Sequence, residues 1–160
     1  MSVAEKQRQL IEDYSLIENR QERLAAIVDR ARNLPPLPAD LRTEAHRVHG
    51  CVSHVWLLAE VKEGRMTFRH DADSPLVRAL FALLCDLYEG AAPADIAATE
   101  PDIFAALGLL RDLTPTRQNG LAAVRARIKS LALDALPRPN LRPGTPPKPP
   151  GPPLRQGGLR

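Results

Sequence analysis

The chain has 160 residues and a formal net charge of +3 at pH 7, and this length suits one domain with a core of its own. It contains no run of about 18 apolar residues, which argues against a membrane span, and its first residues lack the apolar stretch of a secretory signal. Its two cysteines make no disulfide framework, so we expect free thiols in a reducing, cytoplasmic compartment.

The basic charge is concentrated at the C-terminal end. Residues 137–160 hold five lysines and arginines, no acidic residue and nine of the sixteen prolines. Subtracting these five charges from +3 leaves a net charge of −2 for residues 1–136. Since proline lacks the N–H of a helix or central strand, we predict a domain at 1–136 followed by a disordered, proline-rich tail. A folded basic face is not indicated, so nucleic-acid binding is not expected.

Two helices are expected in the first part of the chain. A weak apolar stripe over residues 3–14 predicts the first helix. Asn19, with Glu22 three residues later, resembles a capping box and should begin the second helix, which Pro35 and Pro36 should end. The apolar face of this second helix is expected to hold Leu24, Ile27, Val28, Ala31 and Leu34.

A β-hairpin is expected next. Residues 53–61 carry apolar side chains on both faces, which predicts a strand that is covered on both sides. The KEG sequence at 62–64 should form the turn. Residues 65–70 alternate apolar and polar side chains, as in a half-exposed antiparallel strand.

A central helix is expected after the hairpin. Ser74 is a suitable N-cap before Pro75, and the helix should end at Gly90. Because this helix is apolar around most of its circumference, we expect it at the centre of the fold. Cys85 lies on its apolar stripe and should be a buried thiol that packs as a small hydrophobic residue.

The rest of the domain is also expected to be helical. Short helices should begin near Pro93 and Pro101, and Thr114 with Pro115 should open the last helix. Its apolar stripe is expected to hold Leu121, Val124, Ile128 and Leu131. Together the elements predict an α+β fold in which a small antiparallel sheet packs against helices.

The segment RVHGCVSHVW, residues 47–56, concentrates the reactive side chains. Structural zinc sites usually combine two separated ligand pairs, whereas ligands along one short strand point to opposite sides. This geometry argues against zinc as the first interpretation, and a small zinc-binding or adaptor module remains the alternative function. Its ligands would be His46, His49, Cys51 and His54.

Two other interpretations of Cys51 remain, a buried thiol or a nucleophile. Gly50 permits a turn where a polar segment gives way to the apolar strand, a position that suits reaction better than packing. Reactivity requires a thiolate, which Arg47, His49 and His54 could favour. The absence of a CxxC motif argues against a dithiol or an iron–sulfur scaffold. A single cysteine can still accept a group and pass it on.

This segment resembles the signature V-x-G-C-x-S-x-V-W of the SufE family, which residues 48–56 match. Three further segments match the family in the same order, namely LPPLPADLRTEAHRV, DADSPLVRAL and LTPTRQNGL. The resemblance covers residues 8–133 and leaves the proline-rich tail outside. It implies a SufE/IscU-like fold.

The resemblance also implies a function. The thiolate of Cys51 would accept sulfur from a persulfide on a PLP-dependent cysteine desulfurase of the SufS/CsdA kind. It would pass this sulfur to a SufBCD-like iron–sulfur scaffold. The chain would stimulate the desulfurase without being an enzyme, and would hold no cofactor or metal of its own. Asp73 and Arg117 would lie at the partner surface. The acceptor loop would be supported by Gly50, Ser53, His49 and His54.

The sequence departs from the family pattern near the cysteine. Val52 and His54 flank the serine where polar residues, often glutamine, are usual, and Ala72 replaces a common serine. Neither departure removes the thiol chemistry. Because an exposed persulfide is readily oxidised, we expect the side chain of Cys51 to turn inward into an apolar pocket in the free protein.

Overall fold

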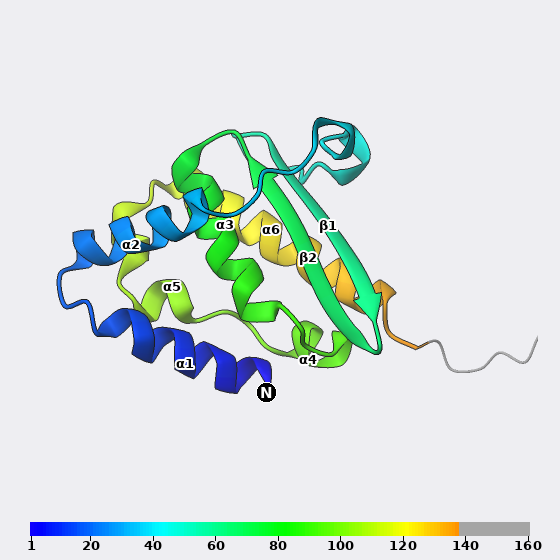
Figure 1. Ribbon diagram of the computed structural model, residues 1–160, viewed down its shortest axis with the longest axis horizontal. Coiled ribbons are helices and arrows are strands. Elements are labelled where there is room, and N and C mark those ends of the chain that lie inside the picture. Colours follow the sequence, from blue (N-terminus) through cyan, green and yellow to red (C-terminus); the bar gives the residue numbers. More distant parts are fainter. Residues whose placement is uncertain (138–160) are drawn as a thin grey trace, which may run out of the picture.

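The computed structural model describes residues 1–137 (Figure 1). From residue 138 onward the predicted tail lies outside the described residues. The helices and 3-10 turns are α1 (Val3–Ser15), α2 (Arg20–Arg32), η1 (Ala39–Leu41), η2 (Glu44–His46), α3 (Pro75–Tyr88), α4 (Pro93–Ala98), α5 (Ile103–Ala106), η3 (Leu109–Asp112) and α6 (Pro115–Asp134). The strands are β1 (Val55–Lys62) and β2 (Arg65–Ala72). This arrangement confirms the α+β fold.

The two strands form an antiparallel hairpin. Val55 lies opposite Ala72 at one end of the register, and Lys62 lies opposite Arg65 at the other. Glu63 and Gly64 connect the strands with φ angles of 52° and 75°. Positive φ angles at both residues are typical of a two-residue hairpin turn, because they match the twist of the flanking strands. The turn predicted for the KEG sequence is therefore confirmed.

The hairpin buries one face against the helices. Val55 and Leu57 are buried, whereas Trp56 and Leu58 on the opposite face are only half-buried. The expectation that the first strand is covered on both sides was wrong, because the described sheet has two strands with the helices packed on one face. On β2 the alternation is as expected, with Met66, among others, buried.

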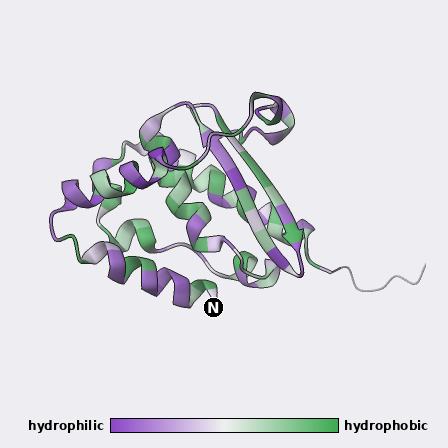
Figure 2. Ribbon diagram, viewed as in Figure 1, coloured by the Kyte–Doolittle hydropathy of each residue, from purple (hydrophilic) through white to green (hydrophobic). Residues whose placement is uncertain are grey.

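Helix α3 occupies the centre of the fold. It contacts α1, α2, α6 and β2, and nine of its residues are buried. Figure 2 shows hydrophobic residues along α3, whereas the outer helix α1 carries many hydrophilic ones. Cys85 is 3% exposed, so the prediction of a buried thiol is confirmed. None of the described helices has the length and apolarity needed to cross a membrane.

Two of the three predicted N-caps make a side-chain hydrogen bond, whereas Ser74 stands at the N-cap of α3 without one. The side chain of Asn19 accepts a hydrogen bond from the Glu22 amide at 3.0 Å, and Thr114 accepts one from the Arg117 amide at 3.3 Å. Helix α2 ends at Arg32, before the two prolines that were expected to end it. The chain beyond it is instead fixed by the Leu37 amide, which donates to the buried Asp71 carboxylate at 2.9 Å.

Helix α6 is held by a buried arginine. Arg125 is 7% exposed, and its guanidinium donates to the carbonyl oxygens of Ile96 and Thr99 at 3.0 and 2.9 Å. It also pairs with Glu100 at 3.2 Å and lies over the ring of Tyr88, 4.8 Å from its centroid. These contacts fix α6 against α4 and α3.

Candidate functional site

The loop that carries Cys51 connects η2 to β1 and is pinned at both ends. The Val48 amide donates to the Val55 carbonyl at 2.8 Å, and the Val48 side chain is buried. At the other end the Asp73 amide donates to the His54 carbonyl at 3.1 Å. The cysteine is therefore presented on a short, closed loop whose ends belong to the hairpin.

Gly50 shapes the tip of this loop. Its φ of +94° is a conformation that residues with a side chain rarely adopt. A Cβ atom at this position would also lie 3.1 Å from the Cβ of Ala123 on α6. The predicted turn at Gly50 is thus present, and it lets the loop lie directly on the surface of α6.

The thiol of Cys51 is turned inward and is partly buried. Its Sγ donates a hydrogen bond to the carbonyl oxygen of Gly120 at 3.4 Å, and its side chain packs against the hydrophobic core. Burial raises the pKa of Cys51 above its usual value of 9.0. The thiol is therefore mostly protonated at neutral pH and is a poor nucleophile in this conformation.

The histidines of the loop face carboxylates. His49 Nε2 lies 3.6 Å from a Glu44 oxygen, and Glu44 also pairs with Arg47 at 3.6 Å. His54 Nδ1 lies 3.3 Å from an Asp73 oxygen. The two carboxylates thus offset much of the positive charge that the sequence placed around the thiol.

The structure places the two expected partner-surface residues differently. Asp73 is exposed and contacts His54 of the loop twice. Its amide donates to the His54 carbonyl, and its carboxylate faces the His54 ring. Arg117 is exposed in the first turn of α6, three residues before the glycine that contacts the thiol. Ser53 is half-buried within the loop, and Val52 beside the cysteine is 83% exposed.

The four proposed zinc ligands do not form a metal site. Within residues 1–137, no group of three or more histidine, cysteine, aspartate or glutamate side chains could hold a metal ion. His49 and His54 have the carboxylate partners described above, and Cys51 points to α6. The alternative zinc-binding interpretation therefore has no support in the described part of the chain.

A shallow hollow lies beside the Cys51 loop. Its volume is about 410 Å³, and its lining includes three basic side chains, those of Arg47, His49 and Arg127. Gly120, Ala123 and Arg127 of α6 were not identified from the sequence as site residues. The only signal was the position of Gly120 inside an otherwise regular helical pattern, where glycine is unfavourable.

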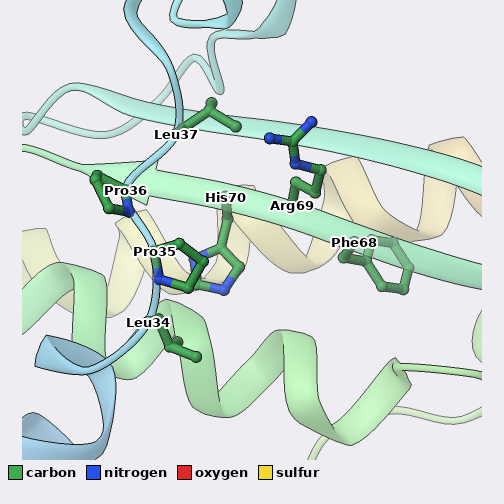
Figure 3. Close-up of a pocket in the computed structure, with 7 residues that line it drawn as sticks. All are labelled: Leu34, Pro35, Pro36, Leu37, Phe68, Arg69 and His70. Carbon is green, nitrogen blue, oxygen red and sulfur yellow. The ribbon is translucent and has the colours of Figure 1, made fainter.

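A second hollow of about 230 Å³ is lined by residues 34–37 and 68–70. Figure 3 shows His70 extending from β2 beside Pro35. Its ring stacks on Phe81, with centroids 6.4 Å apart. Burial, together with the charge of Arg78, lowers the pKa of His70 from 6.5 to about 4. None of the predicted site residues lines this hollow, so it is separate from the Cys51 loop.

Comparisons with known proteins agree with the architecture. The family model SufE, described as an Fe-S metabolism associated domain, matches residues 8–132. An uncharacterized SufE-like protein of Rhizobium meliloti is 32% identical over 134 residues, covering 81% of this chain and 96% of the relative. The sulfur acceptor protein CsdE of Escherichia coli is 34% identical over 110 residues, covering 68% and 75%. The solution structure of a hypothetical protein from Thermus thermophilus matches with a TM-score of 0.67 and 28% identity, covering 82% and 96%.

Proposed function

The chain belongs to the SufE family, and from this premise we propose that it is a sulfur acceptor in iron–sulfur metabolism with Cys51 as the acceptor thiol. The observation that carries the proposal is the contrast between the two cysteines. Cys51 lies on a closed loop at the surface, in the segment that matches the family signature, whereas Cys85 is sealed in the core at 3% exposure. One position in the chain can therefore exchange sulfur with a partner.

The proposed reaction is an exchange between thiol and persulfide. The thiolate of Cys51 attacks the outer sulfur of a persulfide held by a cysteine desulfurase. An S–S bond forms to Cys51, the S–S bond on the desulfurase breaks, and the desulfurase cysteine leaves as a thiolate. A thiolate is consumed and a thiolate is released, so the step needs no external oxidant or reductant.

The free protein holds Cys51 in a resting state. Burial raises the pKa of Cys51, which keeps the thiol protonated, and the inward position shields a sulfur that would otherwise be open to oxidation. Docking of the desulfurase turns the side chain outward, where contact with water favours the thiolate. Gly50 supplies the backbone freedom that this movement needs.

The surface around the loop receives the desulfurase. Val52 is an exposed apolar side chain next to the acceptor, and Asp73 and Arg117 are both exposed. Gly50, Ser53, His49 and His54 support the loop between them. The sulfur then passes to a SufBCD-like assembly scaffold in the cytoplasm.

The carrier role predicts stimulation of the desulfurase. Removing sulfur from the persulfide of the desulfurase regenerates its thiolate, so each transfer permits another turnover. Alanine production from L-cysteine by a SufS/CsdA-like desulfurase is therefore expected to rise when this protein is added. The Cys51→Ser variant should give no rise, whereas a folded Cys85→Ala variant should stimulate like the wild type. Equal stimulation by wild type and Cys51→Ser would overturn the assignment.

A further inference from the structure

Gly120 lies inside helix α6, several residues after its start at Pro115. Glycine in a helix interior is less favourable than alanine, because it loses more backbone freedom on folding. A glycine at this place therefore calls for a local reason. Its neighbourhood in the structure supplies one, because the helix backbone here is in contact with the Cys51 loop.

The sulfur of Cys51 lies in tight contact with the space where a side chain at Gly120 would begin. A Cβ atom built on Gly120 would lie 3.3 Å from the Sγ of Cys51 and 4.0 Å from its Cβ. The same Sγ donates to the Gly120 carbonyl at 3.4 Å. The missing side chain thus gives the thiol room against the helix, and the backbone carbonyl there accepts its proton.

The next turn of the helix makes a second close approach to the loop. Ala123 follows Gly120 by three residues, so the two lie on the same face of α6. A Cβ on Gly50 would come within 3.1 Å of the Ala123 Cβ. Loop and helix therefore meet at two adjacent points, and larger groups at either point would force them apart.

We propose that Gly120 is a positioning residue for the acceptor, because its missing side chain forms the seat that holds the Cys51 thiol against α6 in the free protein. The role of this seat in sulfur transfer rests on the proposed function. The seat itself is a property of the free protein and can be tested without a desulfurase. Arg117 and Asp73 are exposed, whereas Gly120 contacts the thiol itself.

The Gly120→Ala variant tests the seat directly. Its methyl group would lie 3.3 Å from the sulfur, closer than an ordinary contact, so the sulfur and its loop must shift by a few tenths of an ångström. The alanine also improves the helix, so α6 is retained. We expect iodoacetamide to alkylate Cys51 of the free variant about fivefold faster or more at pH 8, since the thiol gains both access and thiolate. The pH midpoint of alkylation should also fall below that of the wild type.

Ala122→Gly is the matched control. Ala122 is exposed on α6 two residues away, so this change loosens the helix without altering the seat. Its alkylation rate should stay within about twofold of the wild type. A Gly120→Ala protein that is folded but alkylated at the wild-type rate would overturn the proposal. So would equal acceleration in both variants, because loosening of the helix would then explain the effect.

A thermal denaturation cycle gives a second test that does not depend on thiol reactivity. In a Cys51→Ala background the seat is empty of sulfur, so Gly120→Ala should raise Tm through better helix propensity. With Cys51 present the same change should raise Tm less or lower it, because the methyl and the sulfur compete. An equal shift of Tm in the two backgrounds would contradict the seat. A failure of sulfur acceptance with any desulfurase would leave both of these tests unchanged.

Discussion

His70 is expected to make the stability of this protein fall steeply in mild acid. Its ring is stacked on Phe81, and its Nδ1 is buried without a hydrogen-bond partner among the described residues. Burial is the main cause that lowers the pKa of His70, and the charges of Arg78 and Arg30 lower it further. Asp71 acts in the opposite direction, and the resulting pKa is about 4. The folded protein therefore resists a proton that the unfolded chain accepts near pH 6.5.

The size of the effect follows from proton linkage. Between pH 6.5 and about 4 the unfolded chain binds more protons at this site, so the free energy of unfolding decreases as the pH falls. Relative to pH 7, the contribution of His70 amounts to a loss of about 2 kcal/mol at pH 5 and about 3 kcal/mol at pH 4. Below the folded pKa the loss reaches its limit, because both states are then protonated.

The His70→Phe variant removes the titration and keeps a ring that can stack on Phe81. Urea unfolding of both proteins at pH 7 and pH 5 gives the difference in free energy of unfolding for each. We expect the wild type to lose about 2 kcal/mol more than the variant over this interval, since contributions from other groups cancel in the comparison. Losses that agree within about 0.5 kcal/mol would refute the reasoning, because His70 would then titrate alike in the folded and unfolded states.

Two further predictions concern packing. Arg125→Met keeps the stem but removes the donor to the Ile96 carbonyl, while the Thr99 carbonyl keeps the Tyr88 hydroxyl. Urea unfolding should therefore show a loss of about 1–3 kcal/mol, and a loss under about 0.5 kcal/mol would contradict this role. Gly50→Ala is strained by its positive φ and by Ala123 and should cost about 1–3 kcal/mol. Gly64→Ala shares the positive φ but meets nothing within 4 Å, so a greater cost at Gly64 would disprove the contact argument.

The elements of the fold could be predicted because each has a local signal. Helix α3 was visible from its apolar surface and from Pro75 at its start, and the hairpin from its alternation and its KEG turn. The end of α2 was misplaced, because a proline limits where a helix can continue but does not fix where it stops. The covering of β1 was misjudged, because apolar residues on both faces of a strand do not reveal how many strands or helices surround it.

The candidate site could be predicted only in part. The glycine before Cys51 indicated a turn, and the matched segments indicated the family, but both are features of neighbouring residues. The contact between Cys51 and Gly120 joins positions 69 residues apart, which no local pattern reveals. The sequence also shows which charges are present without showing how they pair, so the carboxylates that face His49 and His54 were not anticipated. Arg125 was missed because arginine is rarely buried.

The most direct test of the account is the intact mass of the protein after incubation with a cysteine desulfurase and L-cysteine. We expect a gain of one sulfur, about 32 Da, that is removed by a thiol reductant. The gain should be present in the wild type and in a folded Cys85→Ala variant, and absent in Cys51→Ser. A reducible gain that persists in Cys51→Ser, or no gain in the folded wild type with an active desulfurase, would contradict the assignment of Cys51 as the sulfur acceptor.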